Sequence, residues 1–167
     1  MLPGVFLATQ KDKTIYYRSN LTYRGKHISL GSFSTEEEAH KAYCEAKEIL
    51  FAPDYAMQTI EDYIDQPHTL SFDKIVTLIN FRDNHLYIPT PIYLHKNYFS
   101  YYLSCDTELK FDIDDLFFYS SHRILQRKGH LYVNDYGMQI TLQSRYRIKS
   151  HAVVNRDYRF INGDELD

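Results

Sequence analysis

YRSNLTYRGKHISLGSFSTEEEAHKAY, from Tyr17 to Tyr43, is the stretch that decides the fold of the N-terminal part of the chain. Apolar and polar residues alternate on both sides of Gly25, which is typical of two antiparallel strands joined by a tight turn. A helix begins directly afterwards, because Ser34 or Thr35 is an N-cap residue with a glutamate three positions later. With a first strand near the N-terminus, the stretch predicts a three-stranded antiparallel sheet and one packed helix.

The spacing of apolar residues predicts which side chains of the strands and of the helix face the core. The longer strand places Leu21 on the core side, and the next strand places Ile28 and Leu30 there. The helix carries an apolar stripe that we expect to pack on the sheet, formed by Ala39, Ala42, Tyr43, Ala46, Ile49 and Leu50. The opposite face of the longer strand carries Tyr16, Arg18, Asn20, Thr22 and Arg24.

Residues 3 to 52 resemble the Apetala/ethylene-response-factor DNA-binding domain in the order of their elements. That order is Gly4 and Val5, then the two strands, then the helix. The resemblance implies that the sheet face opposite the helix reads the major groove of duplex DNA. Only Arg18 stands at a base-reading arginine position of the family, and an ordinary solvated face is the alternative interpretation. The residues expected to bind DNA are Tyr16, Arg18, Asn20, Thr22, Arg24, Lys26, His27 and Ser29.

Charge and composition narrow the classes of protein. The 167 residues carry a net charge of −3. Residues 1–52 hold seven Lys/Arg and six Asp/Glu, and residues 53–167 hold twelve and sixteen, so neither part is the strongly basic body of a tight phosphate binder. The isolated Cys44 and Cys105 fit neither a disulfide framework nor a zinc site. No apolar run is long enough to span a membrane, and a reducing cytoplasm is the expected compartment.

The chain as a whole predicts an α+β fold in three segments. Residues 1–52 form the DNA-binding-like domain, 53–72 a connector, and 73–167 a second, mixed and β-rich domain.

Individual elements of the later segments are also predicted. A short helix is expected near Ile60, and the apolar burst at 75–79 is interpreted as the beginning of the β-rich texture. Asp112 or Asp114 could cap a short helix, and a hairpin is predicted from residue 130 to 143.

The end of the chain resembles the centre of the HNH homing-endonuclease motif, at 161–164 and at Leu166 and Asp167. Arg159 and Phe160 stand where that motif has its Asp-His pair. A phenylalanine cannot activate water or hold a metal. The resemblance therefore implies a degenerate HNH scaffold, without catalytic residues, metal ligands or a cofactor.

Two functions of different classes remain open. The first is a non-catalytic DNA-binding protein of a phage or mobile element, derived from a homing endonuclease, with duplex DNA as its partner. The second is a phage-encoded inhibitor of a host nucleic-acid-processing protein, similar in role to anti-CRISPR proteins. The second would bind its partner through a group of tyrosines and aspartates. The alternative interpretation is that the tyrosines belong to the core and the aspartates to a solvated helix start. The residues are Tyr98, Tyr101, Tyr102, Asp112, Asp114 and Asp115.

Overall fold

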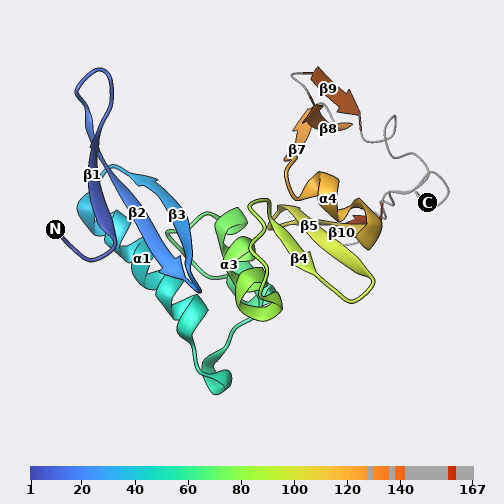
Figure 1. Cartoon of the computed structure of the whole chain (residues 1–167), viewed down its shortest axis with the longest axis horizontal. Coiled ribbons are helices and arrows are strands. Elements are labelled where there is room, and N and C mark those ends of the chain that lie inside the picture. The colour runs from blue at the N-terminus through green and yellow to red at the C-terminus, as the bar shows by residue number, and fades with distance from the viewer. Residues whose placement is uncertain (128–129, 136–137, 142–157, 161–167) are drawn as a thin grey trace. The chain divides into compact units, whose positions relative to one another are not determined.

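Two compact units divide the chain, Met1–Arg82 and Asp83–Asp167. Both contain helices and strands (Figure 1), which confirms the predicted α+β class. The first unit extends past residue 72, so it includes the expected connector and most of the helix that follows. The structure is a computed structural model, and it describes residues 1–127, 130–135, 138–141 and 158–160.

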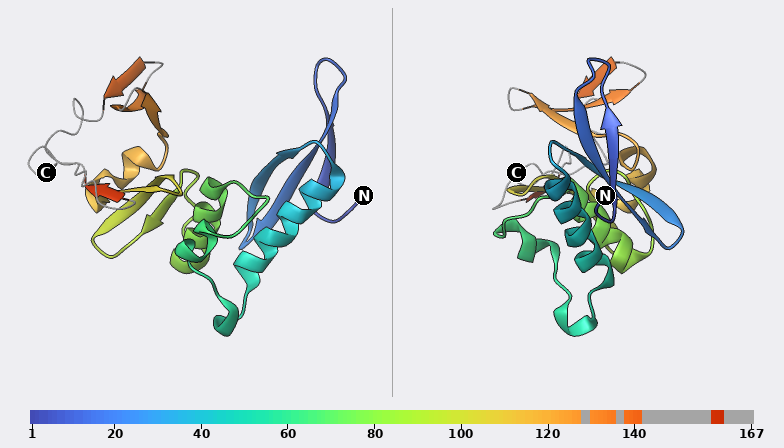
Figure 2. Two further views of the ribbon diagram at one scale, coloured as in Figure 1. Left: turned by 180° about the vertical axis from the view of Figure 1, so that it is seen from behind. Right: turned by 90° about the vertical axis from the view of Figure 1, so that its left-hand side faces the viewer.

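Sheet A of the first unit has three antiparallel strands in the order β1 (Val5–Thr9), β2 (Ile15–Tyr23), β3 (Lys26–Phe33). Helix α1 (Glu36–Phe51) lies across one face of this sheet (Figures 1 and 2). The predicted sheet and packed helix are thus confirmed. The core between them is formed by the expected strand positions and helix stripe, with Val5, Leu21, Ile28, Leu30, Ala39, Ala42, Ala46, Ile49 and Leu50 buried.

Local chemistry explains where these elements begin and turn. Thr35 caps α1, since its Oγ1 accepts a hydrogen bond of 3.2 Å from the amide of Glu38. The β2–β3 turn has two residues with positive φ, Arg24 at 50° and Gly25 at 78°. Two such residues define a type I′ turn, whose twist matches that of the flanking strands.

Gly4 allows a helix residue to approach the beginning of β1. Its φ is 79°, and a Cβ at this position would overlap the ring of Tyr43 on α1. Gly25 has almost the same φ, but no atom lies within 4 Å of the place its Cβ would occupy. The two glycines therefore share a backbone conformation, whereas only Gly4 also makes room for packing.

Helix α3 (Phe72–Asn84) corrects the β-rich texture expected for this part of the chain. Every residue from Ile75 to Arg82 is buried. Such a helix has no polar face, so its apolar run cannot be told from a buried strand by periodicity. The short helix expected near Ile60 is confirmed as α2 (Ile60–Ile64), which follows the 3-10 turn η1 (Asp54–Ala56).

Glu45 of α1 holds the beginning of α3. Its Oε1 accepts hydrogen bonds of 2.9 Å from the amides of Thr69 and Leu70. Its Oε2 accepts one of 2.8 Å from the amide of Thr69. These amides lie just before the first turn of α3, so one carboxylate connects two helices of the first unit.

The described residues of the second unit form two sheets. Sheet B has the order β10-β6-β5-β4, with β10 parallel to β6 and the other neighbours antiparallel. Its strands are β4 (Ile92–Leu94), β5 (Tyr98–Ser104), β6 (Thr107–Asp112) and β10 (Tyr158–Phe160). Sheet C is antiparallel and consists of β7 (Ile124–Arg127), β8 (His130–Asp135) and β9 (Met138–Thr141). The β8–β9 pairing confirms the predicted hairpin.

An aromatic cluster forms the core of the second unit. Phe111 stacks on Tyr119 with ring centroids 4.4 Å apart, and on Phe99 at 5.5 Å. The predicted short helix is present as η2 (Ile113–Asp115) followed by α4 (Leu116–Tyr119). Asp112 is its N-cap residue, but the side chain makes no capping hydrogen bond. The HNH-like residues 161–164, 166 and 167 lie outside the described residues.

We expect Gly4→Ala to lower the free energy of unfolding more than Gly25→Ala. Both variants place a Cβ at positive φ, which costs about 1–2 kcal/mol. Only Gly4→Ala also meets the Tyr43 ring, and overpacking typically adds about 1–3 kcal/mol. Urea unfolding measures the difference. Adding Tyr43→Ala should narrow the gap between the two glycine variants, and equal losses in the single variants would contradict the role of Gly4.

Glu45→Ala should destabilise the first unit by about 1–3 kcal/mol, because two partly buried amides lose their acceptor. Glu48→Ala is the matched control, since Glu48 is exposed on the same helix. Urea unfolding monitored by circular dichroism compares the two. Equal effects would show that the carboxylate of Glu45 does not hold α3.

Candidate nucleic-acid interface

The open face of sheet A brings most of the predicted DNA-binding residues together. Residues opposite one another in an antiparallel pair project to the same face. In the β2–β3 ladder, Asn20 pairs with Ser29 and Thr22 with His27. In the β1–β2 ladder, Tyr16 pairs with Ala8 and Arg18 with Phe6. The face opposite α1, which we call the open face, therefore carries Phe6, Ala8, Tyr16, Arg18, Asn20, Thr22, His27, Ser29 and Ser32.

Arg18 lies at the middle of the open face and is held by an aromatic neighbour. Its Nη2 donates a hydrogen bond of 2.9 Å to the hydroxyl of Tyr16, and its guanidinium carbon lies 5.6 Å from the centre of that ring. Phe6, opposite Arg18 on β1, is 51% exposed. An exposed guanidinium held against one aromatic ring is positioned for stacking and for paired hydrogen bonds.

A β-bulge sets which residue of β3 faces Arg18. The pairing shifts between Ser19 and Asn20, so that Leu30 has no partner on β2. The bulge leaves Leu30 in the core and turns Ser32 to the open face opposite Arg18. Phe6, Ala8 and Ser32 were not among the predicted site residues. The available signal was Gly31, a glycine inside a strand, which has a φ of 127°.

Arg24 and Lys26 lie at the β2–β3 turn beside the open face and do not project to it, whereas strand alternation had placed Arg24 on that face. The guanidinium carbon of Arg24 lies 5.6 Å from the ring centre of Tyr23, and its Nε donates a hydrogen bond of 3.3 Å to that hydroxyl. Lys26 pairs with Tyr23 and so projects to the same side. Tyr23 packs on Phe51 of α1, on the helix side of the sheet. The positive φ of the turn residues ends the alternation assumed for a straight strand.

Positive charge is concentrated in the strands and their turns. Residues 5–33 contain five Lys/Arg and one Asp, a balance of +4, whereas residues 34–52 contain two Lys and five Glu, a balance of −3. The near-neutral total therefore hides a separation between sheet and helix. Lys11 and Lys13 contribute to it from the β1–β2 turn, which projects beyond α1 (Figure 2). A sequence pattern of two lysines in a short inter-strand loop could have identified them.

The residues proposed to bind a protein partner do not form one surface. Tyr101 and Tyr102 are 1% and 6% exposed, and Asp115 is 4% exposed. For the two tyrosines the core interpretation holds, and Asp115 is buried where a solvated helix start was expected. Tyr98 is half-buried and stacks on His95 with ring centroids 4.2 Å apart. Only Asp112 and Asp114 remain exposed.

A second polar group lies in sheet B, around the fully buried Ser100. Its hydroxyl donates a hydrogen bond to Glu108, and Nε2 of His95 lies 3.0 Å from the same oxygen. In a catalytic triad the carboxylate bonds the histidine, and the histidine removes the serine proton. Here the serine donates its hydrogen bond directly to the carboxylate of Glu108, so the arrangement is suited to holding β5, β6 and the residue after β4 together.

Within the described part of the chain, no group of three or more His, Cys, Asp or Glu side chains is placed to hold a metal ion. No helix there has the length and apolar character needed to cross a membrane. Comparisons of the chain with protein-family models, with curated proteins and with solved structures give no match.

Proposed function

We propose that the first unit binds duplex DNA through the open face of sheet A and does so without cutting it. The observation that carries the proposal is the exposed Arg18, held over Tyr16 at the centre of the one sheet face that α1 does not cover. A sheet of two or three strands can enter the major groove, where each base pair presents a distinct pattern of donors and acceptors.

The chemistry of the open face fits direct readout of bases. The guanidinium of Arg18 can donate two hydrogen bonds to a guanine, and the amide of Asn20 can pair with an adenine. Phe6 is an apolar group of the kind that contacts the methyl group of thymine. The hydrogen bond between Arg18 and Tyr16 supports this role, because a positioned side chain loses less entropy on binding.

The lysines of the β1–β2 turn are assigned to phosphate contacts. Lys11 and Lys13 are exposed at the end of the sheet, and phosphate contacts of this kind orient a protein on DNA without reading sequence. No nuclease step is included in the proposal. Phe160, at the place of the activating histidine in the HNH resemblance, has no group that accepts a proton.

Arg18→Ala should weaken binding to a selected duplex by about 1–3 kcal/mol, the usual contribution of a bidentate base contact. Binding to a random duplex should change much less. Fluorescence anisotropy on both duplexes, with a site selected from a random library, measures the two affinities. Arg18→Lys is the companion variant: it keeps the charge but loses the planar pair of donors, so it should also lose specificity.

The Lys11→Ala/Lys13→Ala variant should weaken binding to all duplexes alike and reduce the slope of log affinity against log salt by about two units, one for each lost phosphate contact. Lys41→Ala/Lys47→Ala is the charge-matched control, because both lysines are exposed on α1 at the other side of the sheet. Anisotropy over a range of salt concentrations gives the slopes. Equal changes in the two variants would mean that net charge alone attracts DNA, and folded variants with unchanged affinity would overturn the assignment.

A further inference from the structure

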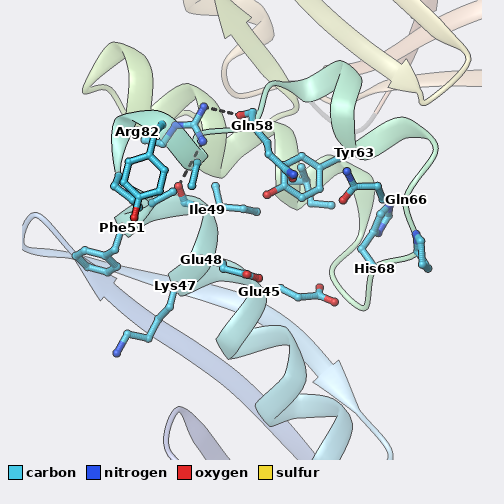
Figure 3. A pocket seen from close by; sticks show the side chains of 16 residues that line it. Glu45, Lys47, Glu48, Ile49, Phe51, Gln58, Tyr63, Gln66, His68 and Arg82 are labelled. Carbon is cyan, nitrogen blue, oxygen red and sulfur yellow. Dashed lines mark hydrogen bonds between the residues drawn. The ribbon is translucent and has the colours of Figure 1, made fainter.

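A pocket of about 600 Å³ lies in the first unit, away from the open face, between α1 and the segment that follows it (Figure 3). The last turns of α1 form one wall. The segment 52–58, helix α2 and residues 66–68 form the other, and Ile75 and Arg82 of α3 also line the pocket. The volume lies in the range of small-molecule sites in proteins.

Arg82 connects the walls of this pocket. It is 8% exposed, and its Nη2 donates a hydrogen bond of 2.8 Å to the backbone carbonyl of Gln58. Its Nη1 donates one of 3.4 Å to the carbonyl of Ile49. Both acceptors are backbone oxygens, so the guanidinium joins α1 to the segment after it. We therefore read Arg82 as a structural residue of the pocket wall.

The charged residues that line the pocket are of both signs, Glu45 and Glu48 against Lys47 and Arg82. Lys47 points away from Glu48 and Tyr63 (Figure 3), and Arg82 is hydrogen-bonded to backbone carbonyls. The pKa of Tyr63 is raised first by burial and then by the charge of Glu48, with smaller contributions in the same direction from Asp62 and Glu45. Arg82 opposes this rise without cancelling it. Glu48 and Tyr63 line the same pocket, and a carboxylate beside a phenol hydroxyl favours a positively charged occupant.

Two polar groups of the pocket are available to such an occupant. Neither the carboxylate of Glu48 nor the hydroxyl of Tyr63 forms a hydrogen bond with any residue that the structure describes. Glu45 differs, since its carboxylate is engaged by the amides that precede α3. Aromatic rings stand at the rim, with Phe51 58% and Tyr55 93% exposed.

We propose that this pocket binds a small organic cation, with an ammonium or guanidinium group against Glu48 and Tyr63 and its alkyl chain along the aromatic rim. Hydrogen bonds between charged groups and contacts of a cation with aromatic rings both favour such a ligand. A free diamine and the side chain of an arginine in a peptide share this chemistry. The site is separate from the open face, so the inference does not depend on DNA binding.

Isothermal titration calorimetry of the full chain tests the proposal with putrescine, agmatine and the peptide Gly-Arg-Gly amide as probes. Neutral 1,4-butanediol and inorganic phosphate are the ligand controls. Glu48→Gln should weaken binding of the cations about tenfold or more, the effect of losing a charged hydrogen-bond partner. Glu37→Gln removes the same charge from the exposed first turn of α1 and should leave the affinity unchanged. Circular dichroism checks that both variants are folded.

Binding of putrescine or agmatine that Glu48→Gln alone weakens supports a site for a free cation. Binding of the peptide alone, with the same dependence on Glu48, supports the same pocket and identifies an arginine side chain as its occupant. Equal weakening by both variants would overturn the proposal in favour of general charge attraction. Binding of phosphate in place of the cations would overturn it in favour of an anion site at Arg82, and the absence of binding by every probe would also overturn it.

Discussion

Close packing of α1 on sheet A is the constraint on which the first unit depends. Ala39, Ala42 and Ala46 are completely buried, and side chains this small let the helix axis come close to the strands. The same closeness explains Gly4, where any side chain would meet Tyr43. Since the alanines contribute little apolar area themselves, the fit must be tight for the core to be stable.

This packing also separates the two faces of the sheet. Because α1 covers one face, the polar side chains of β2 and β3 gather on the other, and the charge follows the same division. The acidic first turn of α1 is stabilised by the helix dipole, whereas the basic residues lie in the strands and turns. A nearly neutral domain can in this way present a locally positive surface. The net charge of residues 1–52 taken together does not show this separation.

The second structural theme is the use of charged side chains to satisfy backbone groups between distant segments. Glu45 accepts from the amides of Thr69 and Leu70, and Arg82 donates to the carbonyls of Ile49 and Gln58. Hydrogen bonds to charged groups are stronger than those between neutral groups. Together they hold the segment after α1 in place, and the pocket is the space that remains between the connected elements.

Local spacing in the sequence determined the hairpin at Gly25, the Thr35 cap, the alanine stripe of α1 and most of the open face, because each depends on residues within about four positions of one another. Only the tertiary structure decided the rest. The burial of α3 on all sides, the bulge beside Ser19 and the turn of Arg24 towards Tyr23 depend on neighbours that periodicity does not reveal. The burial of Tyr101 and Tyr102 also depends on such neighbours, because tyrosines occur both in protein cores and on binding surfaces. The pocket requires Arg82 to meet Ile49, a pairing across 33 positions that no local pattern encodes.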